Sequence, residues 1–502
     1  MDIQHSNSLV EAQFRKANQL RSSGLFQPAL KIYVELGRTL GFPASILHNS
    51  AVCLLGLGRK ENALKLCVQA QRKEPQFAQS YLLQSRIEKI LEPTGVDADL
   101  SLSRLLAIPQ LNDSLAGQAR VELAALQLNT FCDPDACAQT ILPILNTPQF
   151  AERARLSYLV SKFYSRTETD EEITKLAFDY ANEFLKKPKF TLAKHQPTRR
   201  RQIGLLSNMI HGGPLYYLTI SAFTQLSESC DIILFNRSKK SDWATEKFRT
   251  IAAHEISCRG MNWVTLSETI RDQKLDVLYE CGGWSDTEAL KAVSTKPAPR
   301  QYKWVGGQAM TTGLDCFDGF ISDPWHTPEG AQPLYTEPLL LMANGYAIYT
   351  PPDYMPRPRT KDRGVVGIIG NPLKVCEELF SRLGKRSANN FQQPKEIRLI
   401  DKRYSNPKVR ERIEPLMKRF KGKVTWVVTE NHQHFLEELS RLEGIFDTSP
   451  HSAGLTAREA LHLGVKVIPP AKERLLFSSR HGISALAAYS GLANQTPPSL
   501  PI

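Results

Sequence analysis

The sequence predicts an α-helical solenoid followed by two α/β lobes with parallel sheets. Two observations predict this order. A pattern of small and apolar residues repeats every 34 residues near the N-terminus, and beyond residue 200 short apolar segments alternate with helical ones. Strand–helix alternation is typical of parallel sheets that helices cover on both faces. We expect domains at residues 1–195, 199–355 and 362–495.

The composition is that of a globular protein. Of the 502 residues, 42% are hydrophobic and 23% are charged, which excludes a largely disordered chain. No apolar run reaches the roughly 18 residues of a membrane span, and the polar N-terminus lacks the apolar core of a signal peptide. The nine cysteines are scattered without a C-x-x-C pair, which fits reduced thiols in the cytoplasm and argues against a zinc ribbon.

The net charge of +12 suggests an acidic partner, such as nucleic acid, an anionic surface or a phosphorylated ligand. The densest basic clusters are residues 199–201 and 357–363, and they do not form one block. For the charge alone, a solvated basic surface is favoured over a dedicated nucleic-acid patch. Nucleic-acid binding is the least favoured interpretation, because no basic motif has interleaved aromatic residues.

The N-terminal repeat has the period of tetratricopeptide repeats. The glycines fall where two short helices meet, and the small alanines let paired helices approach closely. Such a solenoid offers a groove for a peptide or protein, and the alternative is a packing scaffold or a contact in a homo-oligomer. The repeated residues are Ala17, Leu20, Gly24, Ala29 and Leu30, which recur as Ala51, Leu54, Gly58, Ala63 and Leu64.

The second half contains two sets of candidate strands joined by a proline-rich link. Two such sets indicate two Rossmann-like lobes, whose ligands bind at the carboxyl ends of the strands. We therefore expect the functional site in the cleft between the lobes. The first set is Gln202–Leu206, Asp231–Phe235, Asp276–Tyr279, Gln301–Val305 and Gly319–Ile321. The second set is Val365–Ile369, Ile397–Ile400, Val424–Val428, Gly444–Asp447 and Val465–Ile468.

Two loops of the first lobe are candidate ligand sites. His211 follows the first strand, beside two glycines, where its imidazole could transfer a proton or form a hydrogen bond with a ligand. The alternative is a loop histidine that caps local backbone. The second loop follows a later strand, and its N–H groups and hydroxyls, including those of Gly306, Gly307 and Thr312, could hold sugar or phosphate oxygens.

Two segments of the second lobe suit a diphosphate. Lys374 is expected in the first turn of the helix that follows a strand, facing the cleft, where a cation could neutralise a departing diphosphate; the alternative is a surface lysine. From Asp447 a small-residue loop leads into a helix that begins near Leu455, with Thr456 in its first turn. The N–H groups of a helix start can bind phosphate. Glu459 is one turn further on, where it could accept hydrogen bonds from ribose or be merely solvated.

A pair of histidines follows the strand Val424–Val428. His432 and His434 have a spacing that suits metal ligands, and Glu430 lies beside them. No further ligands are spaced to complete a metal site. Contacts with a nucleotide are therefore favoured over a metal.

Together, these stretches resemble the O-linked N-acetylglucosamine transferase / SPINDLY family, and its bacterial members in particular. The resemblance covers Arg199 to about Leu492, and the repeats ahead of it match the family's domain order. Besides residues 447–459, it rests on Lys296–Gln301, Trp304–Leu314, Gly319–Pro328 and Leu334–Leu340.

The resemblance implies a GT-B fold and an inverting, metal-independent sugar transfer from a nucleotide-sugar to Ser or Thr of a protein. The helical repeats would recruit the acceptor, and related enzymes glucosylate Asn instead. UDP-GlcNAc is the expected donor, while UDP-glucose, GDP-fucose and rarer bacterial sugars stay open. The donor is a substrate, and no further cofactor is implied.

The resemblance also assigns residues. His211 matches the active-site histidine of the first loop, and Lys374 matches the lysine that contacts the donor diphosphate. His434 resembles the histidine before the last strand. The remaining matches are the helix start that holds the diphosphate and an acidic ribose ligand, which is usually aspartate; they correspond to Gly454, Leu455, Thr456 and Glu459.

The chain departs from the family's pattern at several points. The loop from Gly370 to Lys374 is short, and the stretch Gly454–Thr456 lacks the usual histidine–threonine pair. Relatives also continue with helices beyond the position of Leu492. These departures favour an alternative of another class, which is a non-catalytic nucleotide-sugar-binding scaffold or chaperone for a glycosylation or adhesin system.

Overall fold

The computed structural model describes residues 2–191, 200–383, 394–470, 474–490, 498 and 500–502. The chain forms two compact units. Unit 1 comprises Met1–Tyr158 with Asn406–Lys408, and unit 2 comprises Leu159–Ser405 with Val409–Ile502. Among the described helices, none combines the length and the apolar character needed to cross a bilayer.

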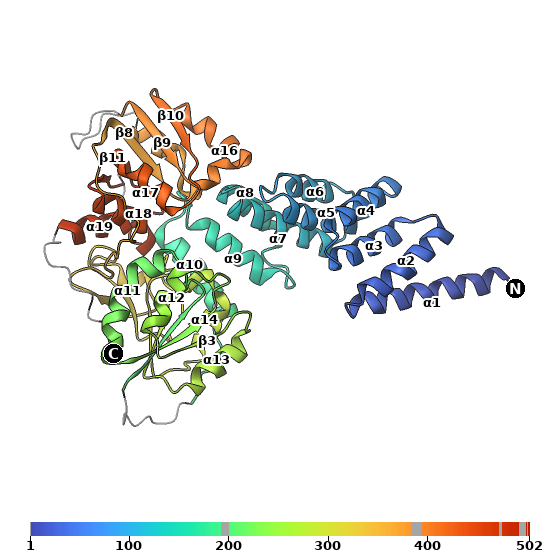
Figure 1. The fold of residues 1–502 in the computed structure, drawn as a ribbon, viewed down its shortest axis with the longest axis horizontal. Coiled ribbons are helices and arrows are strands. Elements are labelled where there is room, and N and C mark those ends of the chain that lie inside the picture. Colours follow the sequence, from blue (N-terminus) through green and yellow to red (C-terminus); the bar gives the residue numbers. More distant parts are fainter. Residues whose placement is uncertain (1, 192–199, 384–393, 471–473, 491–497, 499) are drawn as a thin grey trace. The chain divides into compact units, whose positions relative to one another are not determined.

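Unit 1 is a series of helices in which each helix packs against the helices next to it in sequence. The series runs from right to left in Figure 1. Gly24 and Gly58 have φ values of +77° and +76° at the turns between paired helices, a left-handed conformation that glycine adopts without strain. Ala29 and Ala63 are fully buried, which confirms the predicted close packing. The helices are α1 (Asp2–Ser22), α2 (Phe26–Leu40), α3 (Ala44–Gly56), α4 (Lys60–Lys73), α5 (Ala78–Leu91), α6 (Val96–Leu106), α7 (Asp113–Asn129) and α8 (Pro134–Ile141).

Unit 2 begins with helices α9 (Ala151–Lys162, from residue 159 onward) and α10 (Asp170–Tyr180), followed by the N-terminal lobe. This lobe contains a seven-stranded parallel sheet in the order β3-β2-β1-β4-β5-β6-β7. Its strands are β1 (Gln202–Ser207), β2 (Asp231–Asn236), β3 (His254–Ser257), β4 (Val277–Glu280), β5 (Arg300–Lys303), β6 (Gly319–Ser322) and β7 (Leu339–Leu341). Its helices are α11 (Pro214–Ser227), α12 (Trp243–Ile251), α13 (Trp263–Asp272) and α14 (Thr287–Ser294).

The C-terminal lobe contains a five-stranded parallel sheet in the order β10-β9-β8-β11-β12. Its strands are β8 (Asp362–Ile369), β9 (Glu396–Ile400), β10 (Lys423–Val427), β11 (Leu442–Phe446) and β12 (Lys466–Ile468). The helices of this half are α15 (Glu377–Leu383), α16 (Pro407–Met417), α17 (His432–Ser440), α18 (Leu455–His462) and α19 (His481–Ser490).

The structure confirms the two Rossmann-like sheets and every candidate strand. The sequence missed β3 and β7, the two edge strands of the larger sheet. The side chains of β3 are exposed or only half-buried, so its sequence has no apolar run. In both sheets the first and fourth strands are neighbours, and the chain order reverses there. Ligands of such sheets bind at the carboxyl ends of the strands at this reversal.

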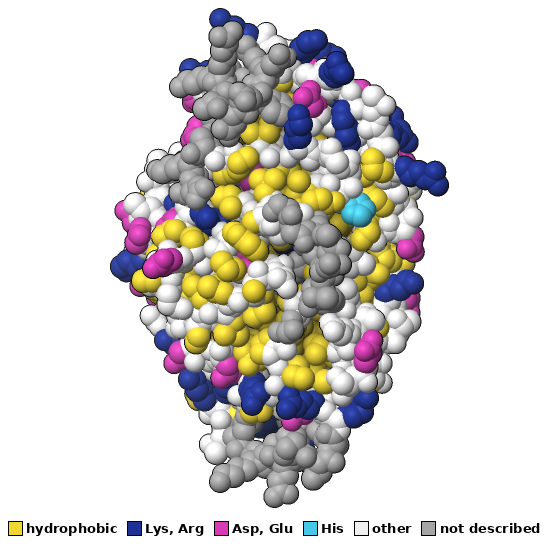
Figure 2. All heavy atoms as spheres, turned by 90° about the vertical axis from the view of Figure 1, so that its left-hand side faces the viewer, with side chains coloured by type: hydrophobic (Ala, Val, Ile, Leu, Met, Phe, Trp, Pro, Cys, Tyr) yellow, Lys and Arg dark blue, Asp and Glu magenta, His cyan; other side chains and the backbone are white. Residues whose placement is uncertain are grey.

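The surface charge is divided rather than gathered. Figure 2 shows a face on which Lys and Arg side chains stand mainly toward the two ends, with Asp and Glu among them. Hydrophobic side chains gather across the middle of this face. On its described part, therefore, the positive charge does not form one continuous patch.

Candidate functional site

The loop after β1 carries His211 at the carboxyl end of the larger sheet. The His211 ring is half-buried, and its Nδ1 atom is 3.1 Å from the carbonyl oxygen of Gly212. The N–H of Gly212 donates to both carboxylate oxygens of Asp242, at 3.0 Å each. Asp242 also caps the start of α12. The loop is therefore anchored to a helix end, and His211 has a fixed backbone.

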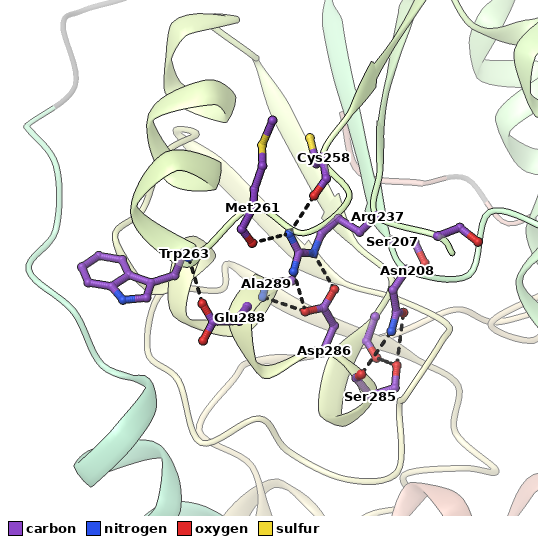
Figure 3. A network of polar contacts seen from close by, with 12 residues as sticks. Ser207, Asn208, Arg237, Cys258, Met261, Trp263, Ser285, Asp286, Glu288 and Ala289 are labelled. Atoms are coloured by element: carbon purple, nitrogen blue, oxygen red, sulfur yellow. Dashed lines mark hydrogen bonds and ion pairs between the residues drawn. The ribbon is translucent and has the colours of Figure 1, made fainter. Parts of the chain in front are cut away.

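A buried ion pair braces the loops around this end of the sheet. Arg237, after β2, contacts Asp286 at the start of α14 through two hydrogen bonds of 2.6 and 3.1 Å (Figure 3). Their side chains are 8% and 9% exposed. Arg237 also donates to the carbonyl oxygens of Cys258 and Met261. Because its donors face acceptors in two other segments, Arg237 holds three segments in register.

A second pair of contacts in Figure 3 joins the loop of His211 to the loop after β4. The side-chain amide of Asn208 donates to the carbonyl oxygen of Ser285 at 3.1 Å, and the hydroxyl of Ser285 donates back to Asn208 at 3.2 Å. The loops at the reversal point of the larger sheet are thus connected directly. This connection positions the segment that leads to His211.

Gly306 and Gly307 lie where two loop backbones approach closely. A Cβ atom at Gly306 would lie 2.2 Å from the carbonyl oxygen of Cys281, and one at Gly307 would lie 2.0 Å from that of Gly282. Both glycines have positive φ. The loops are held from beneath by Lys303, which is fully buried and donates to the carbonyl oxygen of Gly306 at 2.8 Å. Packing of the backbone therefore accounts for both glycines.

Thr312 is fully buried beneath this loop. Its hydroxyl donates to Oε1 of Glu337 at 2.5 Å, and its N–H donates to the same atom at 2.7 Å. Thr311 donates to the other carboxylate oxygen at 2.6 Å. These contacts account for the burial of Thr312 inside the lobe.

Lys374 ends a short 3-10 helix (Pro372–Lys374) after β8. Its Nζ atom donates to the carbonyl oxygen of Ser452 at 2.7 Å. Burial lowers the pKa of Lys374 to about 8, although the carboxylate of Asp447 acts in the opposite direction. Ser452 lies just before α18, so the structure brings Lys374 to the helix start with which the sequence grouped it.

The loop between β11 and α18 is held by a buried carboxylate. Asp447 accepts hydrogen bonds from the hydroxyl of Ser452 at 2.7 Å and from the N–H of Ala453 at 2.6 Å. Burial raises the pKa of Asp447 to about 6. Gly454 is the N-cap residue of α18, and among the described residues no side chain caps it. The first N–H groups of α18, at Leu455 and Thr456, are therefore suited to an anion.

Glu459 lies one turn into α18 and is 1% exposed. It accepts a hydrogen bond of 2.7 Å from Nε2 of His432, at the start of α17. The other ring nitrogen of His432 is 2.9 Å from the hydroxyl of Tyr354 and 3.3 Å from that of Tyr217 on α11. These contacts link the C-terminal lobe to α11 of the N-terminal lobe.

His434 does not share the contacts of His432. Its Nδ1 atom faces the N–H of Glu430 at 3.5 Å, and its own N–H donates to the Asn431 side chain that caps α17. The H-x-H spacing drew attention to this segment, but it could not show that the ring of His432 is the one that contacts Glu459. Tyr217 was missed because it belongs to an apolar helix with no distinguishing pattern.

Metal ligands do not gather at this site. Within the part of the chain that the structure describes, no three His, Cys, Asp or Glu side chains are arranged to hold a metal ion. In the C-terminal lobe the structure instead places a cation and an uncapped helix start beside each other, with a carboxylate–histidine pair one turn further on, and the N-terminal lobe supplies a loop histidine. This set suits a phosphorylated ligand and a reacting hydroxyl.

Comparison with known proteins supports the resemblance expected from the sequence. No protein-family model matches the chain. Curated relatives include the probable UDP-N-acetylglucosamine–peptide N-acetylglucosaminyltransferases SPINDLY of Solanum lycopersicum and Petunia hybrida. The first is 24% identical over 62% of this chain and 35% of the relative. The second is 24% identical over 47% of this chain and 26% of the relative. The chain thus spans about a third or less of the length of these relatives.

A solved structure confirms the fold class. A mutant O-GlcNAc transferase of Thermobaculum terrenum aligns with a TM-score of 0.73, covering 89% of this chain and 86% of that chain. Sequence identity over the alignment is 20%. The helical repeat domain and the two α/β lobes of this chain therefore form a tetratricopeptide and GT-B architecture.

We expect Arg237→Met to lower the free energy of unfolding by about 3–5 kcal/mol, because it leaves the buried charge of Asp286 unpaired. Urea denaturation of the full chain measures this. In the double variant Arg237→Met/Asp286→Asn no buried charge remains, and the asparagine can still cap α14. We expect the double variant to recover part of the loss; a double variant less stable than Arg237→Met would contradict this interpretation.

Proposed function

We propose that the protein is a glycosyltransferase that moves a sugar from a UDP-linked donor to a protein hydroxyl by inversion, without a metal. GlcNAc is the best candidate sugar, and Ser or Thr the best candidate acceptor. The observation that carries the proposal is the position of Lys374 against the uncapped start of α18 at the reversal point of the smaller sheet. The names of the curated relatives support the same chemistry.

The donor diphosphate would bind between Lys374 and the first turn of α18. The N–H groups of Gly454, Leu455 and Thr456 carry the positive end of the helix dipole, and Lys374 adds a full charge. As the bond to the sugar breaks, negative charge grows on the diphosphate. Groups that are already in place stabilise this charge without reorganisation. The loop bonds to Asp447 keep the helix start in place.

The acceptor hydroxyl would approach from the N-terminal lobe, where His211 lies. His211 either orients the hydroxyl or takes its proton late in the reaction. The contacts of Gly212 with Asp242 and of Asn208 with Ser285 fix the loop that carries it. Fixed placement of both reactants accounts for a large part of the rate enhancement in such two-substrate reactions.

The nucleoside end of the donor would lie beside His432 and Glu459. Since Glu459 is buried behind His432, we propose that the two act as a pair, with Glu459 orienting the ring and accepting from ribose as the donor enters. His434 would contribute at the edge of this subsite. Gly306 and Gly307 would shape the facing loop, and Thr312 would support that loop from within.

Unit 1 would recruit the acceptor protein. It contains a cavity of about 480 Å³ lined by Phe42, Leu47 and Leu66 together with Arg72 and Lys73, a mixture that suits an amphipathic peptide. All nine cysteines are free thiols, which supports a reducing compartment such as the cytoplasm. A homo-oligomer built through unit 1 is compatible with this role.

We expect release of nucleoside diphosphate from one member of a panel of nucleotide-sugars when the protein is mixed with cell lysate as acceptor. Lys374→Ala should lower the rate at least ~100-fold, because one preorganised charge on the leaving group is lost. Lys239→Ala, an exposed lysine after β2, is the matched control and should keep the wild-type rate. Saturable nucleotide binding without release from any donor would contradict the transferase and favour the non-catalytic scaffold.

We expect the wild-type protein to bind UDP at least tenfold more tightly than 2′-deoxy-UDP, since a hydrogen bond to a buried carboxylate contributes about 1.5–3 kcal/mol. In Glu459→Ala the affinities for UDP and for 2′-deoxy-UDP should become nearly equal. Calorimetric titration measures both. Glu437→Ala on α17, whose carboxylate lies in an exposed contact with Gln433, should keep the wild-type ratio. An unchanged ratio in Glu459→Ala would show that ribose is recognised elsewhere.

A further inference from the structure

Three side chains outside the donor contacts described above form a hydrogen-bonded chain that ends at the start of α18. Asp323, just after β6, accepts from Nδ1 of His326 at 3.0 Å. Nε2 of His326 is 2.9 Å from Nδ1 of His481, the first residue of α19. Asp323 and His326 are almost completely buried, whereas His481 is half-buried. This series of hydrogen bonds therefore runs from the buried carboxylate of Asp323 outward to the ring of His481.

The donor and acceptor roles in this series of hydrogen bonds follow from the carboxylate of Asp323. Asp323 can only accept, so Nδ1 of His326 carries the proton. In neutral His326, Nε2 is then an acceptor, and Nδ1 of His481 must donate to it. The remaining atom, Nε2 of His481, is unprotonated in the neutral state and can take a proton from solvent. Asp323 would stabilise the resulting imidazolium through His326.

The ring of His481 lies against the helix start. A Cβ atom at Gly454 would lie 3.6 Å from Cδ2 and 3.9 Å from Nε2 of His481. The N–H of Gly482 donates to the hydroxyl of Ser452 at 2.8 Å, in the loop that precedes α18. Nε2 of His481 is therefore next to the N-cap residue where we propose that the diphosphate binds.

The ionisable groups around His481 are two further histidines, two cations and two carboxylates. Burial and the charges of His326, His451, Lys374 and Arg458 hold the pKa of His481 well below its ordinary value. Burial and Lys374 also lower the pKa of the neighbouring His451, to about 3. The carboxylates nearby are Asp323, which is committed to His326, and Asp447, which is committed to its own loop.

A second observation that favours a bound anion concerns Arg458. Its side chain is on α18 and is 6% exposed, and its Nη2 atom has no hydrogen-bond partner among the described residues. The guanidinium is 5.5 Å from the ring centre of Tyr346, and its charge contributes to lowering the pKa of both His326 and His481. A buried guanidinium with an unsatisfied donor is costly unless a ligand completes its hydrogen bonds.

We propose that His481, held by Asp323 through His326, is a further ligand of the donor diphosphate and takes up one proton when the diphosphate binds. The proton comes from solvent and binds to Nε2, which then donates a hydrogen bond to a phosphate oxygen. No covalent bond forms or breaks in this step. The inference rests on the proposed function, because it places the diphosphate at the start of α18.

Proton uptake follows from the charges around the ring. Without a ligand, burial together with the charges of Lys374 and Arg458 makes a positive charge on the ring unfavourable, so His481 stays neutral near pH 7. A bound diphosphate reverses this field, which raises the pKa of His481. Binding should therefore be stronger below neutral pH and weaken as the pH rises through the value of the bound state. The two states of the ring differ by one proton, so the limiting slope is tenfold per pH unit.

Calorimetric titration of the full chain with UDP between pH 6 and 8, in buffers of different ionisation enthalpy, measures this uptake. UDP and Lys374 contribute their own protonation, so the test is the difference between wild type and His481→Asn. We expect the variant to take up fewer protons, to bind UDP at least tenfold more weakly at pH 6.5, and to show a flatter pH profile. His254→Asn, on the exposed edge strand β3, is the matched control and should behave as wild type.

Two further variants separate the role of His481 from folding. His481→Gln serves if His481→Asn does not fold, and the same loss is expected. In His326→Gln the link to Asp323 is broken while His481 remains, so uptake should persist but shift to lower pH. If the His481 variants match wild type while Lys374→Ala binds UDP weakly, the inference is wrong and the proposed function stands. If Lys374→Ala also binds UDP as wild type does, the proposed diphosphate site itself is wrong.

Discussion

The buried carboxylate of Asp323 is the constraint on which the site depends most. It accepts hydrogen bonds from the N–H groups of Trp325, His326 and Tyr346, from the ring of His326 and from the hydroxyl of Ser484. Burial of a charge is costly unless such partners surround it. These contacts hold the pKa of Asp323 well below its ordinary value despite burial. One carboxylate thereby ties the end of β6, the link between the lobes and α19 together.

Buried carboxylates with several hydrogen-bond donors also lie at other strand ends of unit 2. Glu280 and Lys303 form an ion pair of 3.1 Å without exposed side-chain surface, and Glu280 also accepts from the N–H groups of Gly282 and Gly283. Asp286 likewise accepts from Arg237 and connects the loops after β2 and β4, and Asp447 accepts from the N–H of Ala453 in the loop after β11. Loops at a cleft cannot rely on an apolar core, because their function requires exposed polar groups. Buried carboxylates hold them in place instead.

The sequence predicted the fold well because its signals are local. The 34-residue period and the alternation of strands and helices are visible in the sequence, whereas β3 lacks the apolar run that marks a strand and β7 is only three residues long. The site was harder to predict. Sequence position could not show that Thr312 is buried against Glu337, or that His432 rather than His434 contacts Glu459. His326 and His481 are 155 residues apart, and only the fold brings their rings together.

A crystal structure of the protein with UDP bound tests the central claim most directly. We expect the β-phosphate within hydrogen-bond distance of Nζ of Lys374 and of the N–H of Leu455 or Thr456. A diphosphate found elsewhere would contradict the claim, for example in the basic cavity that Lys239, Lys240 and Arg259 line beside β2 and β3. In that case the start of α18 would be an ordinary helix end.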